Sequence, residues 1–254
     1  MLNRKDEIKQ ENKKSFRIFL IILILSGLSG GVFGILAVIG GEDVAVIMAD
    51  VSIIMTWLAP YLMIVFVLVF NIFEIVMYKK SRNLFQAWDG EDEETARQID
   101  VKTGYAMWAI VLNIILSSLL FALSMNFQVQ SFENLRKVPI LLAVSIINMF
   151  LTIWLQRKTV DLVKEMNPEK QGSIYDIKFQ DKWLKSCDEA EKMQIYESAY
   201  SSYKITNTAM PIAWVITALG TIFAWTGPFA CIIVSVLWAI QSSVYCYKSI
   251  QFSK

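Results

Sequence analysis

The stretch TAMPIAWVITALGTIFAWTGPFACIIVSVLWAIQSSVYCY (residues 208–247) decides the fold, because it is almost unbroken apolar sequence. A helix needs roughly 20 apolar residues to cross the hydrocarbon core of a bilayer, and this stretch is about twice that length. Its one break is Thr226-Gly227-Pro228, a combination typical of turns. The stretch therefore predicts two membrane-spanning helices joined by a tight turn.

The rest of the chain has the same character. Of its 254 residues, 55% are hydrophobic, whereas soluble domains average about 45–50%. The excess lies in long runs, so we expect an all-α, polytopic membrane protein that forms a single membrane domain over residues 1–254. The six predicted spans are approximately residues 16–40, 52–78, 104–126, 138–156, 208–226 and 228–247.

Lysine and arginine set the predicted orientation. With the N-terminus in the cytoplasm, every lysine and arginine except Arg136 and Lys137 falls on the cytoplasmic side. The cytoplasmic loops of membrane proteins carry such an excess of basic residues. We therefore predict three helical hairpins, each entered from the cytoplasm, with both termini inside. Two helical connectors, residues 79–103 and 157–207, are then cytoplasmic as well.

The connector of residues 157–207 is the longest segment outside the predicted spans. Asp188 and Glu191 have the spacing of a capping box, which predicts that a helix begins there. Aromatic residues follow at helical spacing, so they share one face of that helix. This connector is the best candidate for a surface that docks a cytoplasmic protein, and packing against neighbouring segments is the alternative. The docking candidates are Trp183, Tyr196, Tyr200 and Tyr203.

The first predicted span contains a glycine-dense run, ILSGLSGGVFGILAVIGG (residues 24–41). Within it, Gly27-Leu28-Ser29-Gly30 matches the G-x-S-G around the serine of rhomboid-type intramembrane proteases. A serine nucleophile needs a neighbouring base, and the chain contains no histidine. We interpret the run instead as the packing surface of a central or dimer-forming helix, because small residues let helices approach closely in lipid. The packing residues are Ser26, Gly27, Gly30, Gly31 and Gly34.

The composition excludes several classes of activity. Without histidine, the chain cannot provide His-ligated metal or haem, or activate a nucleophile through histidine. Its three cysteines lack metal-ligand spacing, and no P-loop motif is present. A net charge of +1 gives no bulk attraction to nucleic acid. We therefore expect a non-enzymatic protein of the lipid bilayer with no cofactor, no metal and no nucleic-acid partner.

Polar residues inside the predicted spans are the remaining candidates for a site, because polar groups in lipid need partners. Asn113 and Asn148 fall near the middle of two spans that form one hairpin. We interpret them as an interhelical hydrogen bond, and a polar site for a solute is the alternative. Gln241 gives the sixth span a polar patch toward its inner end.

Asn71 and Glu74 are the sharpest intramembrane pair. They lie three residues apart and therefore share one face of the second span. Glu74 precedes Tyr78 by one turn, so we expect it near the cytoplasmic interface. There a basic side chain would neutralise it, and the candidates are Lys79, Lys80 and Arg157. The functional alternative is a carboxylate linked to a proton or a cation.

Two motifs carry a resemblance to a known family. The segments AWDGEDEE (87–94) and GSIYDIKFQDKWLKSCDEAEKMQIYESAYSSYK (172–204) resemble a family of six-span membrane proteins from Gram-positive bacteria. That family is a domain of unknown function, and the resemblance covers nearly the whole chain. It implies a bacterial plasma-membrane location, and it implies no activity, substrate or site residue.

Two functions remain open on the sequence. The first is a non-enzymatic accessory or regulatory membrane subunit that acts through a cytoplasmic protein, either an ATPase or a regulator. The second is a permease or transporter subunit, including the membrane half of an ATP-driven exporter. A homo-oligomer is compatible with both.

Overall fold

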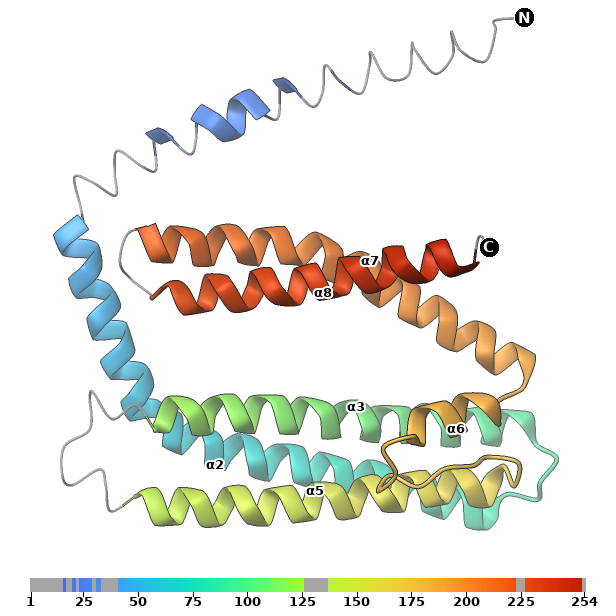
Figure 1. Ribbon diagram of the computed structural model, residues 1–254. Coiled ribbons are helices and arrows are strands. Elements are labelled where there is room, and N and C mark those ends of the chain that lie inside the picture. Colours follow the sequence, from blue (N-terminus) through green and yellow to red (C-terminus); the bar gives the residue numbers. More distant parts are fainter. Residues whose placement is uncertain are drawn as a thin grey trace, which may run out of the picture. The chain divides into compact units, whose positions relative to one another are not determined.

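The computed structural model describes residues 41–125, 137–222 and 227–252, together with residues 16, 20, 21, 23–28, 31 and 32. Contacts along the chain divide it into two compact units, one of residues 51–204 and one of residues 1–50 and 205–254. The helices are α2 (Gly41–Ala87), α3 (Glu93–Ser124), α5 (Val138–Met166), α6 (Phe179–Lys185), α7 (Glu189–Ile222) and α8 (Pro228–Phe252), as Figure 1 shows.

All secondary structure among the described residues is helical, which confirms the predicted all-α class. Five helices are long and apolar enough to cross a membrane, namely α2 from Ala49 onward, α3, α5, α7 and α8. The second, fourth and sixth predicted spans lie entirely within α2, α5 and α8. α3 and α7 contain the third and fifth spans except for their last residues. The first predicted span, residues 16–40, lies mostly outside the described residues, so six spans stay a prediction.

The helices run well beyond the predicted spans at the ends that carry the charged connectors. α2 continues past residue 78 to Ala87, and α5 continues past residue 156 to Met166. In the same way, α3 begins at Glu93 and α7 begins at Glu189, before the apolar sequence starts. The connectors are therefore mostly helical, and their non-helical residues are 88–92, 167–178 and 186–188.

α2, α3 and α5 form a three-helix bundle within the unit of residues 51–204, and α3 and α5 lie antiparallel along one another (Figure 1). At one end of the bundle, Met63, Val67 and Leu141 form a buried apolar cluster. At the other end, Ile99, Leu155 and Leu162 are fully buried, and an ion pair between Arg82 and Glu165 joins α2 to α5. The level between these two apolar ends is polar.

Hydroxyl groups on these helices bond to their own backbone. Thr103, Thr152 and Thr159 are buried, and each donates to the carbonyl oxygen four residues earlier at 2.6–3.0 Å. Such bonds satisfy a hydroxyl without a second helix, which suits an apolar surrounding. Most large apolar side chains of the bundle point outward and are exposed. Lipid would cover such a surface, in keeping with the length of the helices.

Two short loops connect the helices where the chain leaves the bundle. Gly90, between α2 and α3, has a φ of 90°, and Gly172, between α5 and α6, has a φ of 119°. Both values lie in the left-handed region that favours glycine. Asp92 then caps α3 by accepting a hydrogen bond from the backbone N–H of Glu94 at 3.1 Å. The turn at Gly90 lets α2 and α3 reverse direction within residues 88–92, whereas Gly172 lies in the longer segment of residues 167–178.

The predicted capping box at the start of α7 is confirmed. The Asp188 carboxylate accepts a hydrogen bond from the backbone N–H of Glu191 at 2.8 Å. In return, the Glu191 carboxylate accepts one from the backbone N–H of Asp188 at 3.1 Å. This reciprocal pair satisfies two donors that a helix start otherwise leaves without partners.

Residues 205–222 of α7 and the helix α8 form a helical hairpin in the other unit. α7 ends at Ile222 and α8 begins at Pro228, so the predicted break at Thr226-Gly227-Pro228 separates two helices. The indole N–H of Trp214 donates to the Ser235 hydroxyl at 3.1 Å and links the two helices.

Only part of the predicted glycine packing surface falls on described residues. Ser26, Gly27 and Gly31 are helical, whereas Ser29, Gly30 and Gly34 lie outside the described residues. A Cβ atom added to Gly27 or Gly31 would meet no atom within 4 Å. The predicted packing role of this run stays a prediction, because the described residues place no atom against Gly27 or Gly31 and most of the run lies outside them.

Candidate functional site

The polar level of the bundle is built from side chains that all three helices contribute. Asn71 and Glu74 come from α2, Asn113 comes from α3, and Asn148 comes from α5. All four are buried, with exposed fractions from 1% for Glu74 and Asn113 to 6% for Asn71. We call these four residues, together with Ser117 of α3, the polar cluster.

Hydrogen bonds connect the members of the polar cluster across the helices. The Asn71 amide donates to Asn148 Oδ1 at 2.7 Å, which links α2 to α5. The Asn113 amide donates to Glu74 Oε1 at 3.0 Å, which links α3 to α2. Asn148 Nδ2 donates to Asn113 Oδ1 and to Ser117 Oγ, both at 3.2 Å. The predicted hydrogen bond between Asn113 and Asn148 is therefore present, as part of a larger network.

The polar cluster contains more acceptors than donors. Each asparagine amide has two N–H groups, and all of them are already donated: Asn71 also bonds to Val67 O at 2.7 Å, and Asn113 also bonds to Asn148 Oδ1 at 3.4 Å. The Ser117 hydroxyl donates to Ile114 O at 3.4 Å. Two buried oxygens, Asn71 Oδ1 and Glu74 Oε2, have no hydrogen-bond donor among the described residues.

The position of Glu74 corrects one expectation from the sequence. Instead of meeting Lys79, Lys80 or Arg157 at the interface, its carboxylate is buried inside the bundle and bonded to Asn113. Arg157 pairs with Asp161 of its own helix at 3.4 Å. The sequence expectation considered α2 alone and therefore missed that Glu74 faces Asn113 of α3.

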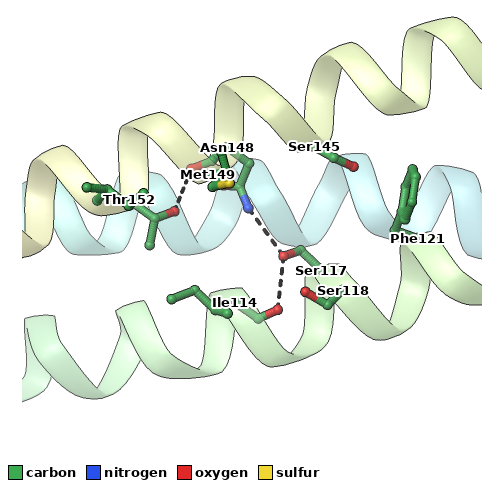
Figure 2. A pocket seen from close by; sticks show the side chains of 9 residues that line it. Ile114, Ser117, Ser118, Phe121, Ser145, Asn148, Met149 and Thr152 are labelled. Atoms are coloured by element: carbon green, nitrogen blue, oxygen red, sulfur yellow. Dashed lines mark hydrogen bonds between the residues drawn. The ribbon is translucent and has the colours of Figure 1, made fainter. Parts of the chain in front are cut away.

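A pocket of about 400 Å³ opens between α3 and α5 beside the polar cluster. Figure 2 shows Asn148 pointing from α5 toward Ser117 on α3, and both residues line the pocket. Its other polar lining residues are Ser118, Ser145 and Thr152, and its apolar lining residues are Ile114, Phe121, Met149 and Ile153. The pocket therefore brings hydroxyl and amide groups to a cavity that reaches the edge of the cluster.

A second buried polar group, Lys170, lies in the connector between α5 and α7. Lys170 is 4% exposed and forms an ion pair with Glu191 at the start of α7. Its ammonium also donates to Cys187 Sγ at 3.3 Å and lies 5.9 Å from the centre of the Trp183 ring. Burial lowers the pKa of Lys170, but its hydrogen bonds to Glu191 and Cys187 outweigh burial, so this pKa lies above the usual value. One lysine thus holds the connector to α7.

The docking candidates on the connector divide into two groups. Tyr196 and Tyr200 are exposed on α7, at 54% and 61%, and Met193 on the same face is 59% exposed. Tyr203 is half-buried, and so is Trp183, whose ring packs 5.5 Å from that of Phe179. Two of the four predicted docking residues, Tyr196 and Tyr200, are therefore exposed. We call these two residues and the neighbouring Met193 the tyrosine face.

The remaining candidate, Gln241, is half-buried on α8 in the other unit and forms no part of the hydrogen-bonded cluster. Sequence reasoning missed Ser117 and Lys170. Ser117 lies four residues after Asn113, so helical spacing alone would have placed it on the same face. Lys170 lies in a charged loop among many exposed lysines, and no local pattern distinguishes it.

Comparison with known proteins places the chain in a family. No curated protein and no solved structure matches it. A family model described as a protein of unknown function (DUF3169) matches residues 12–249, which includes the polar cluster, the pocket and the connector. The chain therefore belongs to the DUF3169 family of proteins of unknown function.

Proposed function

We propose that this protein is a non-enzymatic accessory or regulatory subunit of a bacterial plasma membrane, and that it acts through a cytoplasmic ATPase or regulator. Six spans arranged as three hairpins, with both termini in the cytoplasm, belong to the same proposal. The positive-inside distribution of lysine and arginine supports this orientation. The resemblance to a Gram-positive membrane family supports the location.

The observation that carries this proposal is the ordered connector between α5 and α7. A buried Lys170, paired with Glu191, fixes the connector to the start of α7. The same helix start presents the tyrosine face, which remains exposed. Tyrosine and methionine are enriched where proteins bind one another, and a rigid helix loses little entropy when a partner docks. An exposed face on a fixed helix is therefore suited to a protein partner.

Photo-crosslinking in the native host tests the proposal. A photoreactive phenylalanine analogue at position 200 is expected to form an adduct with one cytoplasmic protein, which mass spectrometry identifies. The matched control is the same analogue at Tyr175, which is 66% exposed but lies in the loop before α6. An adduct at 200 and none at 175 supports docking on the tyrosine face. No adduct at 200, or an adduct only with a second copy of the chain, contradicts it.

A permease or transporter subunit is the second candidate, and one observation favours it. The polar cluster places two acceptor oxygens without donors inside an apolar helix bundle. Buried polar groups at membrane depth are expensive and commonly mark paths for ions or solutes. Solute-flux assays on proteoliposomes that contain the purified chain would distinguish this candidate from an accessory subunit, because only a permease carries solute by itself.

A further inference from the structure

The two oxygens without donors call for a positively charged partner. Glu74 Oε2 and Asn71 Oδ1 are three residues apart on α2, which places them on one face of the helix about one turn apart. A buried carboxylate without charge compensation costs several kcal/mol in an apolar medium. No ion pair among the described residues involves Glu74, so none of these residues compensates its charge.

The hydrogen bonds of Asn71 fix which atom of its amide is the oxygen without a donor. Exchanging N and O in Asn71 would direct its oxygen at Val67 O and Asn148 Oδ1, two acceptors that now lie 2.7 Å from its nitrogen. Two acceptors so close require the nitrogen in that place. Asn71 Oδ1 must therefore remain the oxygen that lacks a donor among the described residues.

We propose that the polar cluster binds one small monovalent cation, with Glu74 Oε2 and Asn71 Oδ1 among its ligands. Carboxylate and amide oxygens are the ligands that hard cations prefer. A single carboxylate balances a single positive charge, whereas a divalent ion would leave one charge uncompensated inside the bilayer. The site lies beyond the proposed accessory function and does not depend on a cytoplasmic partner.

The pocket between α3 and α5 borders the polar cluster, although neither Glu74 nor Asn71 lines it. Ser117 and Asn148 line the pocket and also belong to the polar cluster, and Asn148 is bonded directly to Asn71. The hydroxyl oxygens of Ser118, Ser145 and Thr152 offer further lone pairs along the pocket wall (Figure 2).

Cation binding to the purified full-length chain tests the proposal. Thermal unfolding is measured in detergent with NaCl, KCl or choline chloride at equal ionic strength, and ²²Na⁺ binding is measured by scintillation proximity. Na⁺ or K⁺ is expected to raise the unfolding midpoint over choline, because a ligand that binds only the folded state stabilises it. About one ion per chain is expected to bind at saturation.

Variants assign the binding to the cluster. Glu74→Gln is expected to abolish both the cation-dependent shift and ²²Na⁺ binding, and Glu74→Asp to weaken binding at least several-fold. The matched control is Asp50→Asn, an exposed carboxylate on the same helix, which should bind as the wild type does. Wild-type protein that responds to pH but to neither cation overturns the proposal, because the partner of Glu74 would then be a proton. Cation binding that survives in Glu74→Gln overturns it as well.

Discussion

Replacing Asn148 with leucine should loosen the three-helix bundle by an amount that the hydrogen bonds predict. Asn148 accepts from Asn71 at 2.7 Å and donates to Asn113 and Ser117 at 3.2 Å each. Interhelical hydrogen bonds in membrane proteins contribute about 0.6 kcal/mol on average. Asn148 Oδ1 also accepts a longer bond from Asn113 at 3.4 Å. Leucine has the same branched shape as asparagine and removes all four bonds, so the free energy of unfolding should fall by about 2 kcal/mol.

Unfolding by SDS in mixed micelles, followed by tryptophan fluorescence, measures this loss. The matched control is Ser145→Ala on the same helix, because the Ser145 hydroxyl bonds to Leu141 O of its own helix at 2.9 Å. The control should stay within about 0.5 kcal/mol of the wild type. A double-mutant cycle with Asn71→Ala should give a coupling of about 0.6 kcal/mol. An Asn148→Leu protein as stable as the Ser145→Ala control would refute the role of the cluster in holding the helices together.

Three further predictions concern the connectors. Lys170→Met should lower the free energy of unfolding by about 2 kcal/mol, the usual value for a hydrogen bond to a charged group. It should also make the connector sensitive to limited proteolysis, whereas Lys178→Met, at an exposed lysine, should have neither effect. Gly172→Ala should destabilise by about 1–3 kcal/mol in thermal unfolding, because of its positive φ and a Cβ only 2.9 Å from an aromatic ring. Gly104→Ala, which meets no atom within 4 Å in a helix, should be neutral or stabilising in the same measurement. Asp188→Ala removes the capping box and should lower the free energy of unfolding by about 1 kcal/mol. Backbone amides in the first turn of α7 should then exchange hydrogen faster.

Much of the helical architecture could be predicted, because long apolar runs and turn residues are local signals. The runs from residue 52 onward correspond to membrane-length helices, and the break at Thr226-Gly227-Pro228 separates α7 from α8. The capping box at Asp188 and Glu191 was equally local. Helix ends were less predictable, because hydropathy detects the apolar span and not the charged turns that continue the same helix.

The polar cluster could be predicted from the sequence only in part. The sequence indicated Asn113 and Asn148 as one pair and Asn71 and Glu74 as another, because each pair is recognisable from spacing within a hairpin or a helix. That the two pairs meet depends on how α2 packs against α3 and α5, which periodicity does not specify. The same reason explains why Glu74 was expected to meet a lysine and instead meets Asn113.

Cysteine labelling of the connector in intact cells tests most directly whether the tyrosine face can meet a cytoplasmic partner. The three native cysteines are first replaced by alanine or serine, and a single cysteine is then introduced at Tyr175 or at Lys137. A membrane-impermeant maleimide should label Lys137→Cys in intact cells and Tyr175→Cys only after the membrane is permeabilised. Labelling of Tyr175→Cys in intact cells, with Lys137→Cys protected, would contradict the proposed orientation and with it a cytoplasmic partner on the tyrosine face.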